Sequence, residues 1–267
     1  MAKTIELKAH AGEMIKPAEM IDISGAGGIS LFAGKVYNQL IYHAFGPMMA
    51  ASGEDFTIPL SELRGLHKGN ERISGAIEAL QKTIVKVRLS NGKTRTVQLL
   101  GGCDMDDEDR PHGRLTYGFD KRMVALLQSS YIFAKLELSV IYQFSSKYAL
   151  ALYEAVARRI RLNNCVEEFS LAEFRELLRV SPGKLENFGK LNERAIRPAL
   201  LEVNGLADFD VYVRPRKEGK RVVGVLMSWG WKDDEGRKEA FAECRRSRVG
   251  RRARLEGTVE HIGIAKT

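Results

Sequence analysis

Long hydrogen-bond donors recur along residues 184–203 of this chain, KLENFGKLNERAIRPALLEV. At helical spacing, Leu191, Ala195, Ala199 and Val203 form one apolar stripe, which predicts a helix packed along that side. The donors of the same segment are Lys184, Asn187, Lys190, Asn192, Arg194 and Arg197. Arginine pairs bidentately with guanine and asparagine with adenine, so this set could read DNA bases, and it could equally hold phosphates.

Pro198 interrupts this segment. Proline removes one backbone donor and its ring clashes with the preceding helical turn. We therefore predict a kink at Pro198, or a boundary between two helical pieces there. We expect the piece before it to carry recognition and the piece after it mainly to pack.

Two predicted β-hairpins supply further positive charge. The run FDVYVRPRKEGKRVVGVLMSW turns at Glu218-Gly219, and IVKVRLSNGKTRTVQLL alternates apolar and basic residues about Asn91-Gly92, a strong hairpin signal. The later hairpin crowds its cations around Glu218, and a phosphate backbone would relieve their repulsion. The candidate DNA-binding residues of the hairpins are Lys86, Arg88, Lys93 and Arg95 in the first, and Arg214, Arg216, Lys217, Lys220 and Arg221 in the second.

The segments before the two hairpins follow the same order. Residues 29–45 carry a helical apolar stripe, residues 56–58 read as a short strand, and two further helical pieces lead to the first hairpin. Helix, strand, helix, turn, helix and hairpin in this order predict a winged helix. The segments KYALALYEAVARRI, FSLAEFRELL and NERAIRPAL repeat the series before the second hairpin, which predicts a second copy of the unit.

The predicted fold class is therefore α+β, with two tandem winged-helix domains. We expect a flexible lead-in at 1–28, a first domain at 29–135 for dimerisation and DNA contact, a second at 136–231 as the principal DNA-binding domain, and a basic tail at 232–267. The first recognition helix, with candidate DNA-binding residues Asn70 and Arg72, is the poorer one because Gly75 weakens it. The tail could contact phosphates or merely confer solubility.

The composition bounds the class of protein. The 267 residues carry a net charge of +8, which points weakly toward a polyanionic partner. No apolar run approaches the roughly 18 residues of a membrane span, the N-terminus lacks the apolar core of a signal peptide, and the three cysteines lie far apart. We therefore expect a cytoplasmic protein with no membrane partner.

Catalytic signatures are missing from the sequence. It contains no GxxxxGK[ST] phosphate loop, and its five histidines show neither HxH nor HExxH spacing. The acidic run at residues 104–109 reads as a solvated loop, without the ligand pattern of a calcium loop. We therefore expect a binding protein and not an enzyme, with no metal site and no cofactor.

The sequence resembles the Rep initiator proteins of iteron plasmids, a family of winged-helix replication proteins. The resemblance spans about residues 30–231 and is carried by LSVIYQFSSKYALALYEAV, FSLAEFRELLRV, FGKLNERAIRPALLEVN and VYVRPRKEGKRVVGVLMSW. It implies binding to direct repeats (iterons) in double-stranded DNA at a plasmid origin, help in origin melting, and recruitment of the host initiator and replicative helicase. It also implies a monomer–dimer equilibrium in which the dimer represses the rep gene.

Other functions fit parts of the same pattern. A dedicated winged-helix transcriptional repressor would use the same fold on a lone operator. A partner-docking winged helix would bind no DNA, and a relaxase-type enzyme would nick it. A single chain with two recognition helices could touch successive major grooves about 34 Å apart without DNA palindromy, which predicts binding to direct repeats.

Overall fold

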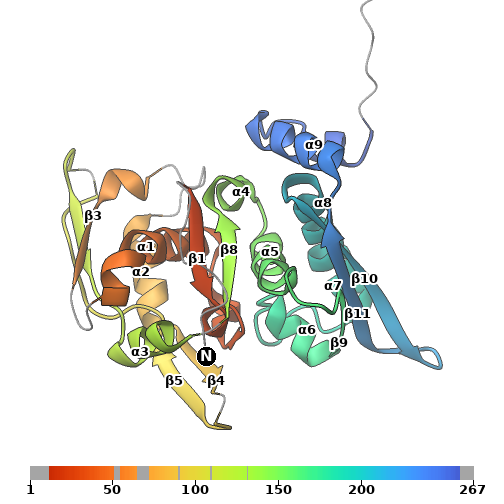
Figure 1. Cartoon of the computed structure of the whole chain (residues 1–267), viewed down its shortest axis with the longest axis horizontal. Helices are drawn as coiled ribbons and strands as arrows, with labels where there is room; N and C mark the ends of the chain where they lie inside the picture. The colour runs from red at the N-terminus through yellow and green to blue at the C-terminus, as the bar shows by residue number, and fades with distance from the viewer. Residues whose placement is uncertain are drawn as a thin grey trace, which may run out of the picture.

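The computed structural model describes residues 12–50, 55–64, 72–89, 91–108, 110–130 and 132–258. Its elements form two halves on either side of α5 (Lys147–Arg159), the helix at the centre of Figure 1. Ser146 begins α5 by accepting a hydrogen bond from the backbone NH of Tyr148 at 3.2 Å. The helix contacts α1, β8 and α8, so both halves share it as part of their cores.

The first half is a helix-turn-helix followed by a wing. α1 (Leu31–Ala50) packs on α2 (Ile73–Lys82), and β4 (Ile84–Arg88) pairs antiparallel with β5 (Thr94–Gln98). The remaining elements of this half include a three-stranded sheet of order β3-β7-β6. They are β2 (Ile23–Ser24), η1 (Ala18–Met20), η2 (Ala26–Gly28), β3 (Phe56–Pro59), η3 (Leu60–Glu62), β6 (Cys103–Met105), β7 (Arg114–Tyr117) and α3 (Lys121–Ser129).

The described part of the expected flexible lead-in, residues 12–28, is instead folded into the first half. β1 (Glu13–Pro17) pairs antiparallel with β8 (Phe133–Glu137), and all five residues of β1 are buried. β2 adds a third strand to the first wing by pairing with β4. The prediction was wrong because the partner of β1 lies about 120 residues away, beyond any local pattern. The predicted domain boundary at 135/136 also falls inside β8.

The second half repeats the first with a longer wing. Its elements before the wing are β9 (Val166–Ser170), α6 (Leu171–Leu177), α7 (Phe188–Leu191), the π-helical turn η4 (Asn192–Ile196) and α8 (Arg197–Leu206). The wing is β10 (Phe209–Glu218) and β11 (Arg221–Trp231), in a sheet of order β10-β11-β9. α4 (Leu138–Gln143) connects this half to β8.

Both predicted hairpin turns are confirmed. β4 and β5 turn through Asn91-Gly92, and β10 and β11 turn through Gly219. Gly92 has φ 81° and Gly219 has φ 58°, in the left-handed region that glycine adopts without a steric penalty.

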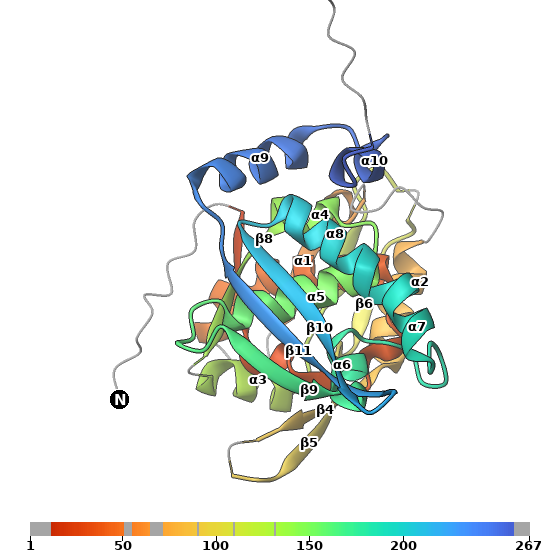
Figure 2. The same ribbon diagram turned by 90° about the vertical axis from the view of Figure 1, so that its right-hand side faces the viewer.

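The described part of the expected basic tail forms two helices. α9 (Asp234–Arg245) begins at Asp233, whose side chain accepts the backbone NH of Gly236 at 2.8 Å, and α10 (Arg251–Leu255) follows. α9 packs on α4 and α8, and α10 packs on α8. Residues 232–258 of the expected basic tail are therefore partly helical and packed on the second half, and we call α9 and α10 with their connection, residues 234–255, the C-terminal extension. It lies above the second half in Figures 1 and 2.

A buried ion cluster joins the two halves. Glu154 of α5, with 0% of its side chain exposed, accepts Lys16 Nζ at 2.9 Å and pairs with Arg179 Nη2 at 2.5 Å. Asn38 of α1 accepts Lys16 Nζ and donates to Glu154, each at 2.8 Å. We call Lys16, Asn38, Glu154 and Arg179 the interdomain cluster. It links β1 and α1 to α5 and to the turn after α6.

Lys35 is a second buried cation between the halves. Its Nζ donates to the carbonyl oxygens of Tyr142 at 2.8 Å and Phe144 at 2.7 Å. Burial, together with the nearby guanidinium of Arg248, lowers the pKa of Lys35 from 10.5 to about 7. The neutral amine still has protons for both carbonyls, so the folded chain can release a proton here at a pH where the unfolded chain keeps it.

This difference predicts that the free energy of unfolding rises with pH between about 7 and 9. The unfolded chain binds more protons than the folded chain over that range, so the slope is positive and at most about 1.4 kcal/mol per pH unit for Lys35. Lys35→Met is expected to flatten the slope in urea titrations at about pH 7, 8 and 9. The exposed control Lys220→Met should keep the wild-type slope, and an unchanged slope in Lys35→Met would contradict the assignment.

Candidate nucleic-acid interface

The second helix-turn-helix is capped and packed as its sequence predicts. Ser170 and Glu173 form a capping box at the start of α6, each accepting a backbone NH, at 3.2 Å and 2.9 Å. The helical segment α7-η4-α8 then runs from Phe188 to Leu206 and packs on α5. Its buried side chains are Leu191, Ala195, Ile196, Ala199, Val203 and Leu206, which include the whole predicted stripe.

Pro198 marks a boundary between two helical pieces, as expected. The residues just before it form the π-helical turn η4, and α8 begins at Arg197 with the proline in its first turn. The wider turn leaves room for a residue that cannot donate to the carbonyl four positions earlier. Packing is not confined to the piece after Pro198, because Leu191, Ala195 and Ile196 before it are also buried.

The predicted recognition residues of this segment lie on its solvent side. Asn192 is half-buried, while Lys184, Asn187, Lys190, Arg194 and Arg197 are exposed. Asn187 caps α7, because its Oδ1 accepts the backbone NH of Lys190 at 3.2 Å. Within the described part of the chain, no side-chain hydrogen bond or ion pair occupies Lys184, Lys190, Arg194 or Arg197. These four cations are therefore available to a partner.

Arg175 positions the turn that carries Lys184, a role that the sequence did not reveal. Its guanidinium donates to the carbonyl oxygens of Lys184 and Leu185. Leu185 has φ 51°, a left-handed conformation that is uncommon outside glycine and needs such support. The pairing was missed because Arg175 lies on α6, and only the turn brings residue 184 back to it.

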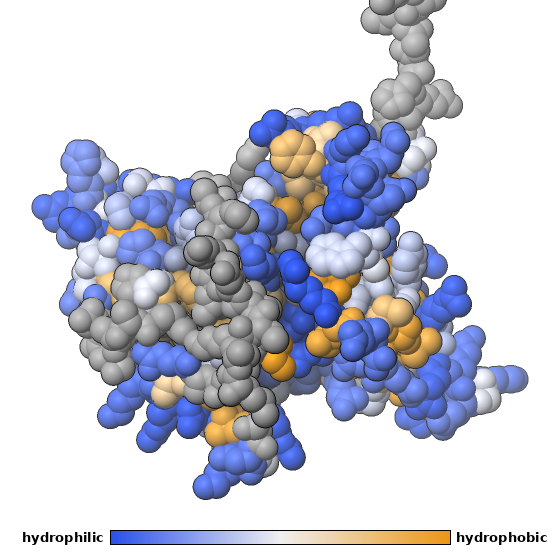
Figure 3. All heavy atoms as spheres, viewed as in Figure 1, coloured by the Kyte–Doolittle hydropathy of each residue, from blue (hydrophilic) through white to orange (hydrophobic). Residues whose placement is uncertain are grey.

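The second wing exposes all five of its predicted DNA-binding residues, Arg214, Arg216, Lys217, Lys220 and Arg221. Arg216 is the exception among them, since it pairs with Glu218 at 2.9 Å and with Glu168 of β9 at 2.5 Å. The sequence predicted one acidic residue in this wing, Glu218, and β9 adds a second, Glu168. The other four cations have no side-chain partner among the described residues. Hydrophilic side chains cover the outer end of this wing in Figure 3.

The first helix-turn-helix differs from the second at the start of its recognition helix. Glu108 accepts the backbone NH groups of Ser74 at 2.8 Å and Ile73 at 3.3 Å, and Arg72 Nε lies 3.5 Å from its carboxylate. Burial alone would raise the pKa of Glu108, but these hydrogen bonds and the charge of Arg72 hold the pKa below its usual range. A carboxylate therefore covers the end of α2 that reaches base edges in this motif.

Glu108 corrects the interpretation of residues 104–109 as a merely solvated loop, since its side chain is only 14% exposed. Arg72 is exposed but paired with this acid, and Asn70 lies outside the described residues. Gly75 lies within α2, so the predicted interruption does not end the helix.

The first wing presents two of its cations, Lys86 and Arg88, on one face of β4. Lys86 and Arg88 alternate with buried residues along β4, and Lys93 is exposed near the turn. Arg95 is half-buried and donates to the carbonyl oxygen of Arg122 at 2.9 Å. Lys86, Arg88 and Lys93 have no side-chain partner within the described ranges. The wing therefore contributes three available cations and one that is used internally.

The two recognition helices lie on the same side of the molecule. α2 and α7 share one edge in Figure 2, and the two are displaced along the long axis in Figure 1. The first wing points downward from the left half of Figure 1, and the second wing points to its lower right. One chain thus offers two similar but unequal helix-turn-helix units in tandem.

Two family models match the chain, "Initiator Replication protein, WH1" over residues 16–157 and "Initiator Rep protein, WH2" over residues 170–229. The chain belongs to the initiator replication protein family. The resemblance and the predicted fold class, α+β with two tandem winged helices, are confirmed. The first match begins in β1 and ends in α5, whereas the C-terminal extension of this initiator lies outside both matches.

The fold is similar to that of a solved initiator protein. The initiator is similar to the Pi initiator protein, solved in complex with iteron DNA, with a TM-score of 0.58 and 15% identity over 84% of this chain and 98% of the Pi chain. It is also compared with domains 2 and 3 of RctB, at a TM-score of 0.42 and 12% identity over 80% of this chain and 85% of that chain. No curated protein matches the initiator in sequence.

The described residues of this initiator contain no group of three or more His, Cys, Asp or Glu side chains placed to hold a metal ion. Likewise, none of the helices described above is long and apolar enough to cross a membrane.

Proposed function

We propose that this initiator is a sequence-specific double-stranded DNA-binding protein that acts at the direct repeats (iterons) of a plasmid replication origin. There it helps to melt the origin and recruits the host initiator and the replicative helicase. As a dimer it represses its own gene. The proposal assigns it no catalytic step, so the pure protein should leave supercoiled plasmid un-nicked.

The observation that carries the proposal is the set of cations on the second recognition helix and its wing. Lys190, Arg194 and Arg197 are fixed on a packed helix yet have no internal partner among the described residues. Four cations of the second wing are also exposed and without a side-chain partner among the described residues, namely Arg214, Lys217, Lys220 and Arg221. Cations held side by side repel one another, and a DNA backbone neutralises them with release of counterions. The Pi initiator, which shares the fold, was solved with iteron DNA.

The tandem arrangement supports direct repeats as the target. The two helix-turn-helix units of one chain are unequal, because the carboxylate of Glu108 covers the start of the first recognition helix, whereas the uncharged amide of Asn187 caps the second. Two unequal units in tandem lack the twofold symmetry that matches a palindrome. A single chain would instead contact successive turns of one face of the duplex.

The test compares duplexes of equal length and composition from the non-coding DNA beside the gene. We expect footprints on tandem direct repeats near an AT-rich tract, and tighter binding to them than to scrambled duplexes. If about eight phosphates are contacted, log affinity should fall against log salt with a slope near −7. Affinity for inverted repeats alone would favour a dedicated repressor, and no binding to duplex at low salt would contradict a DNA-binding role.

A further inference from the structure

The C-terminal extension has a fixed place on the second winged helix. Glu243 of α9 accepts Arg251 Nε at 3.1 Å and Arg254 Nη2 at 2.6 Å, which ties α10 back to α9. Arg251 also donates to the carbonyl oxygen of Gln143 in α4 at 3.1 Å. Gly205 of α8 leaves no space for a Cβ atom, which would lie 2.4 Å from a methyl carbon of Leu255. The extension is therefore seated on α8 by packing and on α4 by the hydrogen bond of Arg251.

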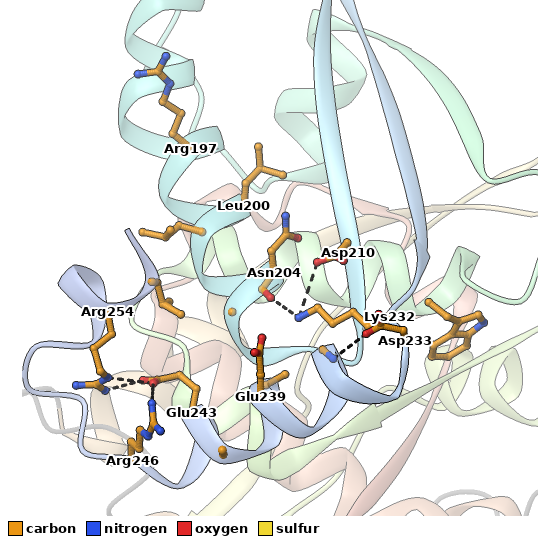
Figure 4. Close-up of a pocket in the computed structure, with 17 residues that line it drawn as sticks. Arg197, Leu200, Asn204, Asp210, Lys232, Asp233, Glu239, Glu243, Arg246 and Arg254 are labelled. Atoms are coloured by element: carbon orange, nitrogen blue, oxygen red, sulfur yellow. Dashed lines mark hydrogen bonds and ion pairs between the residues drawn. The ribbon is translucent and has the colours of Figure 1, made fainter. Parts of the chain in front are cut away.

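The seated extension carries more positive charge than its own acids neutralise. Glu243 is shared by three arginines, since Arg246 Nη1 also lies 3.7 Å from it. One carboxylate thus faces three guanidinium groups, an excess of two positive charges. Figure 4 shows Arg246 and Arg254 converging on Glu243 in a groove between α8 and α9, which Arg197 of α8 also lines. The acids Asp210, Asp233 and Glu239 line the same groove.

A second groove joins the extension to the candidate interface. It has a volume of about 690 Å³, and Arg194 and Arg197 of the recognition helix line it together with Arg248 and Arg252 of the extension. Five arginines and three glutamates line this groove, and Glu202 is already used by the backbone NH of Ser145 at 2.9 Å. Arg248 donates to Gln143 Oε1 at 3.3 Å, and Arg252 pairs with Glu256 at 2.8 Å. Cations of the extension therefore line the same groove as Arg194 and Arg197 of the recognition helix.

We propose that the C-terminal extension binds the DNA phosphate backbone beside the segment contacted by the second recognition helix. Arg246 and Arg252 are the phosphate ligands, because their side chains are 62% and 83% exposed. Arg252 Nε also pairs with Glu256 at 2.8 Å, an exposed ion pair of the kind that contributes little to stability and that a phosphate can replace. Phosphate oxygens relieve the excess charge around Glu243, and α10 shares one edge of the molecule with α2 and α7 in Figure 2. This inference rests on the proposed function, since it adds a sequence-independent contact to the same complex.

The test is a salt titration of binding to a random-sequence 40-bp duplex by the full chain and by Arg246→Ala/Arg252→Ala. Losing two phosphate contacts should make the slope of log affinity against log salt shallower by about 1.8 and weaken binding roughly tenfold near physiological salt. Hydroxyl-radical footprints on the non-coding DNA should lose protection at one flank only. Both arginines are exposed, and a thermal melt equal to that of the wild type checks that the variant folds.

The matched control is Arg237→Ala/Lys238→Ala, which removes two exposed charges from the first half of α9, away from α10. It should keep the wild-type slope and footprint. Equal losses of affinity in both variants would mean that net charge alone causes the effect, and this would overturn the inference. An unchanged salt slope in Arg246→Ala/Arg252→Ala would also overturn it. The proposed function is read separately, from the preference of the wild-type chain for direct repeats over scrambled DNA.

Discussion

Alanine in place of Glu154 is expected to lower the free energy of unfolding by about 3–5 kcal/mol, because it strands two buried cations. Lys16 is 1% exposed and Arg179 is 12% exposed, and Glu154 is the carboxylate that pairs with both. Asn38 would also lose the acceptor of its side-chain amide. Urea unfolding at neutral pH measures the loss, and the exposed control Glu186→Ala should stay within about 0.5 kcal/mol of the wild type.

The carboxylate of Glu154 should also make the free energy of unfolding depend on pH in the acid range. Burial alone would raise the pKa of Glu154, but Arg179 and Lys16 outweigh it and hold the pKa at about 2. A folded pKa below the unfolded value contributes stability that is complete above about pH 4.5 and is lost as the pH falls toward 2. A Glu154→Ala loss below about 1 kcal/mol, or an unchanged acid limb, would contradict this role of the interdomain cluster.

The second large effect is expected at the recognition helix. Arg194→Ala and Arg197→Ala should each weaken binding to the direct repeats by about 1–3 kcal/mol, and the double variant by more than either. Both side chains are exposed and have no partner among the described residues, so their removal should leave the thermal melt unchanged. Fluorescence anisotropy with repeat and scrambled duplexes measures the change.

The pattern of loss distinguishes two roles for these arginines. A loss confined to the repeat duplex identifies a base contact, whereas an equal loss on both duplexes identifies a phosphate contact. Arg237→Ala/Lys238→Ala again removes two positive charges elsewhere and should bind as the wild type does. Unchanged affinity in the Arg194→Ala/Arg197→Ala double variant would remove the second recognition helix from the proposed interface.

The sequence predicted those parts of the fold that depend on neighbouring residues. Asn91-Gly92 and Gly219 set the hairpin turns, Ser170 with Glu173 set the start of α6, and Pro198 set a helix boundary. Each of these signals acts within a few residues of where it occurs. The two tandem winged helices could be predicted because these local signals occur in the same order in both repeated units.

The parts that sequence reasoning missed depend on distant partners. β1 is buried only because β8 pairs with it, and a polar-looking run such as EMIKP gives no sign of that. The C-terminal extension was taken for a tail because its charge density suggested solvent, whereas Glu243 draws in arginines 8 and 11 residues further on. Leu255 completes the seat against Gly205 of α8.

The sequence predicted which basic and amide side chains form the candidate interface. It did not predict which of these side chains are already paired within the folded chain. Exposure of the second recognition helix and of both wings agrees with expectation, although DNA contact by these residues remains a prediction. Sequence alone could not show that Arg216 is held by Glu168, that Arg95 is used by a backbone carbonyl, or that Glu108 covers α2. Each of these partners comes from another strand or loop.

The shared helix α5 and the interdomain cluster have a geometric consequence for the DNA. Because one rigid helix belongs to both cores, the offset between the two recognition helices is built into a single chain and not left to a linker. For the proposed binding to direct repeats, this fixed offset requires the two contacted grooves to face the same side of the duplex. An insertion of about 5 bp between the two contacted grooves would turn one groove to the opposite face of the duplex. One of the two winged helices would then lose its contact with the DNA.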